Sequence, residues 1–504
     1  MEKYLFKTDS TSGNFRLLMG FPACKAFALS SLGYMWLYKT ASEIPDTKVD
    51  MVCTDYIQNI NIKDVDAISF SMSFDFDFNG VFEILDKYKI PFLSEERDKN
   101  YPLIFAGGPV ITTNPEPYKR IFDFMVIGDG EEIIKNIIEI LKTAPDKTNA
   151  LKELSKLDGI YIPEITQKVK KITENLNNVI YSPIISDESY FKNTFIIELA
   201  RGCMNRCAFC TASYLNLPFR SYDYEKIIEA IELGLKHTDK IALLGAQLSA
   251  HPQFNDLLDY IDNKIKTGSK IELSMSSLRT DSVSPKLIKT LVSGGQKSST
   301  IAIEAASERL RKFINKNLLN AQIYNAVKTS RENGLKALKI YSMIGIPTET
   351  DEDIKEFINL AEELKKQNKG FEITFSFSSF VPKPQTPLQN CPRESTKTLE
   401  NKQKFIEKSL SKIGIASKFS SIKWDYWQTV LSRGDERLTP LLISVYKNGG
   451  KLGAYKKAVK ELELDITETI NGYSATSEYP WIFIENYASN TQLSNEFKRL
   501  CKFK

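Results

Sequence analysis

Three cysteines lie within eight residues, and their type and spacing are the clearest indication of chemistry in this chain. The stretch is Arg201-Gly202-Cys203-Met204-Asn205-Arg206-Cys207-Ala208-Phe209-Cys210, with the spacing Cys-x3-Cys-x2-Cys. Three thiolates on one short loop can bind three corners of an iron–sulfur cube, because cysteine thiolate is the usual protein ligand of such clusters. The fourth iron then has no protein ligand from this loop and can bind a substrate or cofactor. The spacing therefore indicates catalysis as well as electron storage.

A zinc site is the alternative interpretation of these cysteines. Structural zinc needs four ligands, only three are local, and His237 and His251 are the only histidines in the chain. Soft thiolates without a nearby fourth ligand favour an iron–sulfur cluster over zinc. The four other cysteines are far apart and are interpreted as small buried hydrophobic residues: Cys24, Cys53, Cys391 and Cys501. For His251, both a structural role and a role toward substrate or a proton stay open.

The composition is that of a globular protein without a strongly charged partner. The chain has 504 residues, of which 42% are hydrophobic, and its net charge is +4. This length suits about two to four domains. The charge gives no support to nucleic-acid binding. The first residues lack an apolar signal segment and no stretch reaches the length of a membrane span, so we expect a cytoplasmic protein.

The first 150 residues alternate short apolar runs with amphipathic ones. The expected strands are residues 15–19, 49–53, 67–71, 103–106 and 124–127, and the expected helices are residues 29–38, 81–89 and 131–142. This alternation predicts a Rossmann-like, flavodoxin-like α/β domain with a parallel sheet, whose ligands bind at the carboxyl ends of the strands. Residues 151–192 are polar and irregular and are interpreted as a linker, with at most one hairpin.

A second alternation begins near residue 193 and continues to residue 387. The expected strands are residues 194–199, 240–244, 270–275, 300–304, 337–343 and 372–377, and the expected helices are residues 224–236, 254–267, 285–293, 321–333 and 351–367. About six βα units are too few for a closed eight-fold barrel, so we predict a partial (β/α)6 TIM-type barrel. The cysteines follow its first strand, where active-site loops lie in this architecture. Residues 388–504 are predicted to be a mostly helical extension.

The cysteine spacing resembles that of the radical S-adenosylmethionine superfamily. Cys203, Cys207 and Cys210 carry the resemblance, and Phe209 stands at the aromatic position that lies near adenine in that superfamily. The resemblance implies a 4Fe–4S cluster whose open iron binds the amino and carboxylate groups of S-adenosylmethionine. One electron from the cluster then cleaves a carbon–sulfur bond and yields a 5′-deoxyadenosyl radical, so the cofactor carries the hard chemistry.

Other strand ends of the predicted barrel also resemble the cofactor loops of that superfamily. Gly245 begins the turn Gly245-Ala246-Gln247 where relatives have Gly-Gly-Glu, although the acidic residue is absent here. Arg279 suits a carboxylate, or forms a surface ion pair with Asp281. Glu304 resembles the acid that holds the ribose or amino group. In Gly345-Ile346-Pro347-Thr348-Glu349-Thr350, Gly345 and Pro347 shape the adenine loop, while Thr350 and Asp353 make a near capping box for the next helix.

Three loops of the first domain resemble those of the cobalamin (vitamin B12)-binding domain that precedes many such barrels. They contain Ser71, then Gly107 and Gly108, then Gly128 and Gly130, each after an expected strand. Some cobalamin domains carry Asp-x-His-x-x-Gly with a cobalt-binding histidine, but no histidine precedes His237 here. A nucleotide-binding Rossmann domain is the alternative, although no Gly-x-Gly-x-x-Gly follows the first strand.

These resemblances predict a radical S-adenosylmethionine enzyme that methylates an unreactive carbon of an unknown substrate with the help of cobalamin. An electron donor such as flavodoxin or ferredoxin would be its partner. The alternatives are radical chemistry without methyl transfer, in which cobalamin carries electrons or is absent, and a non-catalytic iron–sulfur sensor. A methylthiotransferase is less favoured, because those enzymes hold a second cluster on three N-terminal cysteines and only Cys24 and Cys53 precede Cys203.

Overall fold

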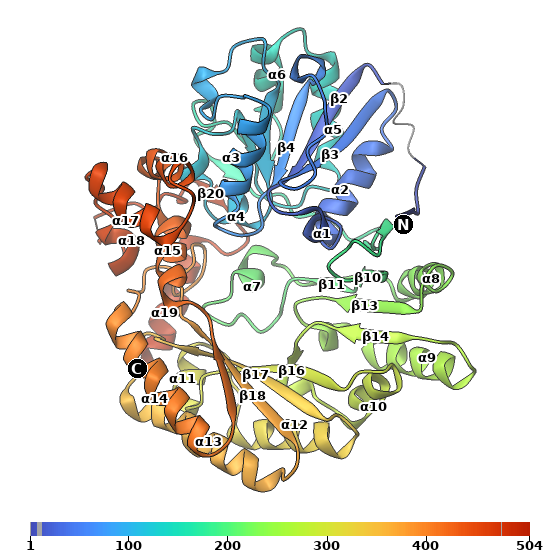
Figure 1. The fold of residues 1–504 in the computed structure, drawn as a ribbon, viewed down its shortest axis with the longest axis vertical. Coiled ribbons are helices and arrows are strands. Elements are labelled where there is room, and N and C mark those ends of the chain that lie inside the picture. Colours follow the sequence, from blue (N-terminus) through green and yellow to red (C-terminus); the bar gives the residue numbers. More distant parts are fainter. Residues whose placement is uncertain (1, 8–12, 475, 504) are drawn as a thin grey trace.

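The computed structural model describes residues 2–7, 13–474 and 476–503. An α/β domain and a curved β/α domain lie one above the other, and the C-terminal helices run along one side of both (Figure 1). The predicted architecture, with a flavodoxin-like domain, a partial barrel and a mostly helical C-terminal region, is confirmed.

The N-terminal sheet has the strand order β3-β2-β4-β5-β6-β7. Its strands are β2 (Phe15–Phe21), β3 (Thr47–Cys53), β4 (Ala67–Ser71), β5 (Leu103–Gly107), β6 (Phe124–Val126) and β7 (Ile160–Tyr161). The first five are parallel and β7 is antiparallel. In chain order this is 2-1-3-4-5, the flavodoxin-like order, in which ligands bind at the carboxyl ends next to the switch point between β2 and β4.

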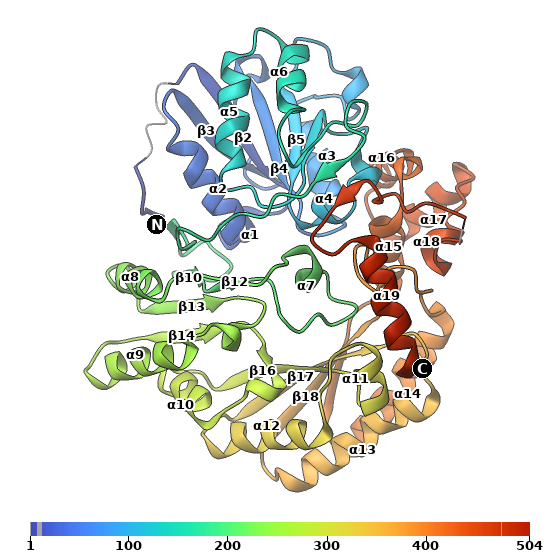
Figure 2. The ribbon, with the colours of Figure 1, turned by 180° about the vertical axis from the view of Figure 1, so that it is seen from behind.

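Helices cover both faces of this sheet, because its strands are apolar on both sides. Helices α2 (Leu32–Ser42) and α5 (Ile133–Thr143) share one core with the sheet and lie in front of it in Figure 2. Helix α3 (Phe78–Lys87) lies on the other face, in a core that continues into the C-terminal helices. Three short helices were not predicted, α1 (Lys25–Ala28), α4 (Pro109–Thr113) and α6 (Lys147–Leu154).

The segment between the two sheets pairs with distant parts of the chain. Strand β8 (Val169–Lys170) is parallel to β20 (Ile484–Glu485), and β9 (Ile184–Ile185) is antiparallel to β1 (Lys3–Tyr4). Among the described residues this segment therefore forms no hairpin of its own. The two-residue strands carry too little alternation to be recognised in a sequence.

The second domain is a partial barrel with its helices on the outside (Figure 1). Strands β10 (Thr194–Glu198), β13 (Lys240–Leu244) and β14 (Glu272–Met275) form one sheet. Strands β15 (Leu278–Arg279), β16 (Ser298–Glu304), β17 (Ala337–Ile344), β18 (Glu372–Ser379) and β19 (Ala416–Phe419) form the other. All these pairs are parallel, so the carboxyl ends open on one side. Strand β19 extends the barrel beyond the six predicted units.

The helices of the barrel agree with the sequence pattern. The five predicted ones are α8 (Tyr224–Leu235), α9 (Phe254–Lys266), α10 (Pro285–Ser293), α12 (Asn320–Glu332) and α13 (Asp351–Gln367). Helix α14 (Thr396–Lys412) lies in the region that was predicted only as a mostly helical extension. Several begin at a side-chain cap, such as Asp223 for α8 and Ser284 for α10. These caps satisfy amide groups that would otherwise lack a partner, which explains why the predicted starts agree so closely.

The aromatic C-terminal stretch packs into the core beside the first domain. Helices α15 (Ile422–Arg433), α16 (Thr439–Lys447) and α17 (Leu452–Glu461) share that core with α3. Trp481 is fully buried there and donates its Nε1–H to Oε1 of Gln389 at 2.8 Å. Among the described residues, none of the helices combines the length and the apolar character that crossing a membrane requires.

Candidate active site

The cysteine loop leaves the first barrel strand through a turn that only glycine can make. Strand β11 (Ala200–Arg201) leads into Gly202, whose φ is +88° and whose Cβ, if present, would lie 2.4 Å from the carbonyl oxygen of Asn216. Both the left-handed backbone and the close contact exclude a larger residue. The loop ends at α7 (Thr211–Leu215), directly after Cys210.

Backbone hydrogen bonds fix the middle of this loop to the barrel. Ala208 donates its N–H to the carbonyl of Ile314 at 2.8 Å and accepts from the N–H of Leu388 at 3.2 Å. The Asn315 side chain donates to the carbonyls of Asn205 and Arg206. The small side chain of Ala208 is fully buried, as tight wrapping requires. The loop therefore has one defined course.

The three thiols are free and chemically suited to bind an iron–sulfur cluster. None of Cys203, Cys207 and Cys210 forms a disulfide, and two of them are buried. Burial raises the pKa of Cys207 to about 12 and also raises the pKa of Cys210. Iron binding would displace these protons, because the thiolate is the ligand. Among the described residues, no three His, Cys, Asp or Glu side chains are arranged around a single ion; in a cube, each cysteine instead binds a different iron.

The turn after β13 contacts the first cysteine. The Cys203 Sγ lies 3.4 Å from Oε1 of Gln247, and Nδ2 of Asn205 lies 3.5 Å from the same sulfur. Gln247 thus stands beside the cysteines, where relatives are expected to carry an acid. Gly245 of the same turn lies next to Ala200 and Leu248. Its contact with S-adenosylmethionine stays a prediction.

Glu304 ends β16 in a strained conformation. Its φ is +67°, which is rare for a residue with a side chain, and the register of β16 shifts at this point. Its carboxylate forms an ion pair with Nζ of Lys316 at 2.9 Å, and both side chains are largely buried. Lys316 gave no signal in the sequence, because nothing in its neighbourhood distinguishes it from a surface lysine.

Arg279 adopts the ion pair that the sequence analysis left open. Its Nε lies 2.7 Å from Oδ1 of Asp281, and its Nη2 donates to the carbonyl of Lys316 at 3.1 Å. The guanidinium is therefore next to the Glu304–Lys316 pair, although part of its hydrogen-bonding capacity is already used. Its role toward a carboxylate of the cofactor stays a prediction.

A small apolar cluster joins the loops predicted to surround adenine. Phe209 is half-buried and packs against a core that includes Ala305, Met343 and Ile346. Phe209 belongs to the cysteine loop, Ala305 follows β16, and Ile346 lies between Gly345 and Pro347 after β17. The tertiary structure thus brings Phe209, Gly345 and Pro347, which the sequence selected independently, into one neighbourhood.

The loop after β17 is held by a buried ion pair. Gly345 has a φ of +75° and donates its N–H to Oε2 of Glu349 at 2.8 Å. The same oxygen lies 2.8 Å from Nζ of Lys402, and the two side chains are 1% and 8% exposed. Burial raises the pKa of Glu349, and Lys402 opposes this effect. Thr350 and Asp353 form the predicted capping box of α13.

Replacing Lys402 with methionine is therefore expected to lower the free energy of unfolding by about 3–5 kcal/mol, because a buried carboxylate loses its partner. Urea unfolding of the two proteins measures this difference. Lys404→Met, on the exposed side of the same helix, is the control and should change stability by less than about 0.5 kcal/mol. Equal losses in both variants would contradict the role given to the ion pair.

His251 is structural. Its side chain is buried, its Nε2 lies 2.9 Å from the carbonyl oxygen of Tyr222, and its Nδ1 accepts from the N–H of Gln253 at 3.1 Å. Both ring nitrogens are therefore used in fixing the turn before α9. Among the two roles that the sequence left open, the structure favours the structural one.

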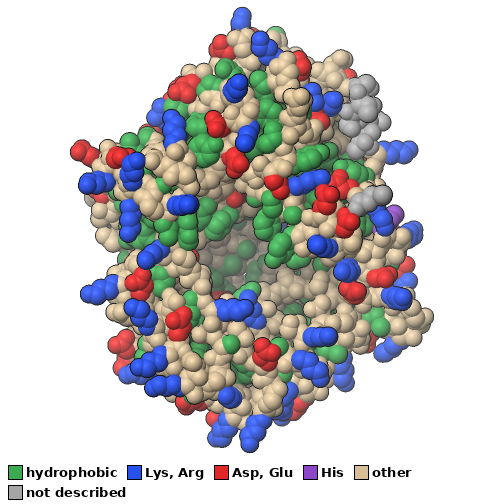
Figure 3. All heavy atoms as spheres, in the orientation of Figure 1, with side chains coloured by type: hydrophobic (Ala, Val, Ile, Leu, Met, Phe, Trp, Pro, Cys, Tyr) green, Lys and Arg blue, Asp and Glu red, His purple; other side chains and the backbone are tan. Residues whose placement is uncertain are grey.

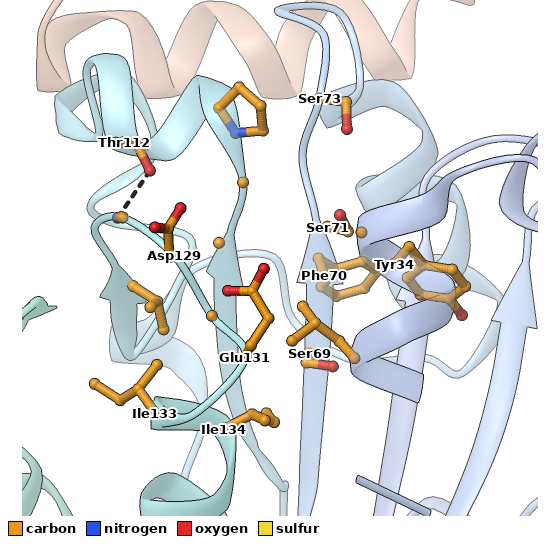
Figure 4. A pocket seen from close by; sticks show the side chains of 18 of the residues that line it. Tyr34, Ser69, Phe70, Ser71, Ser73, Thr112, Asp129, Glu131, Ile133 and Ile134 are labelled. Carbon is orange, nitrogen blue, oxygen red and sulfur yellow. Dashed lines mark hydrogen bonds between the residues drawn. The ribbon is translucent and has the colours of Figure 1, made fainter. Parts of the chain in front are cut away.

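A cavity of about 340 Å³ lies at the carboxyl ends of the N-terminal strands (Figure 4). All five residues predicted for this domain line it: Ser71, Gly107, Gly108, Gly128 and Gly130. Its wall combines apolar side chains such as Phe105 and Ile134 with hydroxyl and charged groups such as Ser69, Asp129 and Lys171. Arg201, Leu215 and Asn216 of the barrel close one side, and the surface is hollowed between the two domains (Figure 3).

The glycines of this cavity have different reasons to be glycine. Gly108 and Gly128 have φ angles of +105° and +116°, and a Cβ on either would lie within 2.5 Å of a backbone oxygen. Backbone conformation and close packing are therefore sufficient to explain why these two residues are glycine. Gly107 has no positive φ, and its Cβ would make only ordinary contacts with Val126 at 3.5 and 3.8 Å. Its lack of a side chain leaves space in the cavity.

The charged rim of this cavity was missed by sequence reasoning. Asp129 and Glu131 project from the loop before α5, and both form ion pairs with Arg201. The acidic residues stood in a motif noted only for its glycines, and Arg201 stood beside the cysteines. Nothing in the sequence around Arg201, Asp129 or Glu131 indicated that the arginine would pair with the two acids.

Two family profiles match the chain. The profile described as "Radical SAM proteins, N-terminal" matches residues 36–163, and "Radical SAM superfamily" matches residues 197–361. An uncharacterised protein of Methanocaldococcus jannaschii is 32% identical over 394 residues, which are 77% of this chain and 82% of that protein. An uncharacterised methyltransferase of Pyrococcus horikoshii is 27% identical over 367 residues, 68% of this chain and 75% of that protein.

Solved structures share the fold. The cobalamin-dependent S-adenosylmethionine radical enzyme OxsB matches with a TM-score of 0.57 at 15% identity, over 90% of this chain and 71% of that one. The radical S-adenosylmethionine methyltransferase TsrM from Kitasatospora setae matches with a TM-score of 0.54 at 13% identity, over 75% and 74% of the two chains. With its three cysteines on the first barrel loop, its partial barrel and these relatives, the chain belongs to the radical S-adenosylmethionine superfamily.

Proposed function

We propose that this enzyme uses cobalamin, bound in the N-terminal cavity, to methylate an unreactive carbon of its substrate. One observation carries the proposal: the five cavity residues selected from the sequence lie around one space, and Arg201, Leu215 and Asn216, on either side of the cysteine loop, line the same space. The neighbours OxsB and TsrM support it, since both were solved with cobalamin bound. We also propose domain boundaries at residues 150, 192 and 387, with β7 of the linker adding to the N-terminal sheet and β19 of the C-terminal region adding to the barrel.

The residues around the cavity fit the chemistry of cobalamin. The ligand combines an apolar ring system with amide side chains, and the wall combines apolar residues with hydroxyl and charged groups. Oε2 of Glu131 is buried without a hydrogen-bond partner among the described residues, so it can accept from an amide N–H. Gly107 lets a ligand approach the end of β5 closely. Ser71, Gly108, Gly128 and Gly130 would complete the site.

The barrel residues would hold the other two cofactors. Cys203, Cys207 and Cys210 would bind the 4Fe–4S cluster, and Phe209, Gly245, Arg279, Glu304, Gly345 and Pro347 would surround S-adenosylmethionine. When bound, the cluster and S-adenosylmethionine would supply the radical chemistry, and cobalamin would supply the methyl group. The protein's own contribution would be to keep the cysteine loop rigid and to cover the reacting groups between the domains. Glu304, Lys316 and Arg279 would orient the charged groups of S-adenosylmethionine.

The alternatives differ in what the N-terminal cavity does. If cobalamin only carries electrons, or does not bind, the barrel would still produce 5′-deoxyadenosine without methylation. A non-catalytic sensor would have no need for the strained Glu304 or the loop around Gly345. We also propose a cytoplasmic location and reduction by a flavodoxin or ferredoxin, and nothing in the charge distribution supports a nucleic-acid partner.

Anaerobic reconstitution tests the proposal. The protein, loaded with iron and sulfide and incubated with hydroxocobalamin, should retain cobalamin through gel filtration with its characteristic absorption spectrum. With a reductant and S-adenosylmethionine it should produce 5′-deoxyadenosine. Untargeted mass spectrometry of cells with and without the gene should reveal a missing methyl group. Retention of the cluster without any cobalamin would favour the cobalamin-free alternative.

A further inference from the structure

One arginine connects the N-terminal cavity to the cysteine loop. Arg201 stands two residues before Cys203 and lines the cavity. Its Nη1 lies 3.1 Å from Oδ1 of Asp129, and its Nη2 lies 2.7 Å from Oε1 of Glu131. Both acids come from the cavity loop between β6 and α5. Nη2 also lies 2.8 Å from Oε2 of Glu198, at the end of the first barrel strand.

A second arginine holds the same carboxylate from the neighbouring strand. Arg220 lies opposite Arg201 in the antiparallel pair of β11 with β12 (Arg220–Ser221). Its Nη1 lies 2.9 Å from Oδ2 of Asp129, so each oxygen of Asp129 faces one arginine. Burial opposes the charge of Asp129, yet Arg201, the N–H of Glu174 and Arg220 hold its pKa below the usual value. The cavity loop is thus clamped by the strand pair that carries the cysteine loop.

The connection from Arg201 to Cys203 is short and stiff. Gly202 is the single residue between them, and its backbone is packed against the carbonyl of Asn216. Asn216 itself lines the cavity. A displacement of the Arg201 backbone therefore has little freedom to be absorbed before it reaches the first cysteine.

The network has unused hydrogen-bonding capacity, part of it on Glu131, which lines the cavity. Oε2 of Glu131 and Nη2 of Arg220 are buried and have no hydrogen-bond partner among the described residues. Buried groups of this kind are costly unless a ligand or water completes them. A ligand in the cavity would meet the same carboxylates that hold Arg201.

We propose that Arg201 is a positioning residue that couples occupation of the N-terminal cavity to the geometry of the cysteine loop. The coupling rests on the proposed cobalamin site. A planar guanidinium can face Asp129, Glu131 and Glu198 at once, whereas a lysine ammonium, a single point charge, cannot match that geometry. Coupling of this kind is reciprocal. The factor by which the cluster strengthens cobalamin binding should equal the factor by which cobalamin favours the loop in its cluster-bound form.

Equilibrium binding measures the coupling without turnover. Hydroxocobalamin is titrated into the full-length protein with and without its reconstituted cluster, and the ratio of the two dissociation constants is the readout. We expect the wild type to bind about 10-fold more tightly when the cluster is present, within the usual range for coupled sites. In Arg201→Lys the ratio should fall to near 1. The electron paramagnetic resonance signal of the reduced cluster should change on cobalamin addition in the wild type only.

Further variants guard against a folding defect. Arg201→Gln with Glu131→Gln removes one positive and one negative charge together, and should fold yet lack the coupling. Arg120→Lys, in the exposed Arg120–Glu95 pair, is the control and should keep it. A wild-type ratio of 1, or an undiminished ratio in Arg201→Lys, overturns the inference while leaving cobalamin binding intact. No cobalamin binding in any form overturns the proposed cobalamin site and the coupling together.

Discussion

Replacing Cys203 with alanine is expected to reduce 5′-deoxyadenosine formation by at least about 100-fold, because every later step depends on the cluster that this thiolate would bind. The three cysteines share one loop, and the structure offers no compact alternative ligand group among the described residues. Iron content and visible absorption of the reconstituted protein should fall together with activity. Product formation is measured by chromatography after addition of reductant and S-adenosylmethionine.

Cys24→Ala is the matched control for this experiment. Cys24 precedes the short helix α1 (Lys25–Ala28) in the first domain, is half-buried and forms no disulfide. The Cys24→Ala variant should keep the iron content and the rate of 5′-deoxyadenosine formation of the wild type. A loss of iron in Cys24→Ala comparable to that in Cys203→Ala would indicate a second cluster and revive the methylthiotransferase alternative. Wild-type activity in Cys203→Ala would refute the assignment of the loop.

Replacing Gly107 with leucine is expected to weaken cobalamin binding by at least about 100-fold while leaving the cluster in place, because a branched side chain would occupy the space that a ligand needs. Gly107 ends β5 and lines the cavity, and its backbone has no positive φ, so leucine is not excluded by the conformation itself. Retention of hydroxocobalamin through gel filtration measures the loss, and iron content reports the state of the barrel.

Two further glycine variants make this prediction specific. Gly107→Ala adds a Cβ that makes only ordinary contacts, so its effect should be small. Gly453→Leu, where a Cβ meets nothing within 4 Å, tests whether leucine at an open position affects cobalamin at all. Unimpaired binding in Gly107→Leu would place the ligand elsewhere. Loss of both cobalamin and iron would instead indicate that the substitution damages the fold.

Much of the fold follows from local sequence patterns. Strand β13 was predicted with the bounds that the structure shows, and so were helices α10 and α13. Strong apolar runs, caps and helical periodicity are properties of neighbouring residues, so the sequence is sufficient to predict them. Strand β19 was missed because only two of its four residues, Ala416–Phe419, are apolar and none is fully buried at the edge of the barrel.

In the candidate site too, the local features were predictable from the sequence and the contacts between distant segments were not. The spacing of Cys203, Cys207 and Cys210 is local, and so is the capping box of Thr350 and Asp353. The partners of Glu304 and Arg201 are not: Lys316 follows a separate helix, and Asp129 belongs to the other domain. Ion pairs between distant segments depend on how the elements pack, and a charged residue looks the same in sequence whether it is paired or solvated.

The sequence by itself determined the cysteine loop, the two α/β alternations and the strand ends at which ligands bind, since each depends on spacing within a few tens of residues. Only the tertiary structure decided that Ser71, Gly107, Gly108, Gly128 and Gly130 surround one cavity, and that this cavity is clamped to the cysteine loop through Arg201. Parallel strands gather their carboxyl ends at one edge, but the choice of which charged groups meet across that edge comes from the packing of two domains against each other.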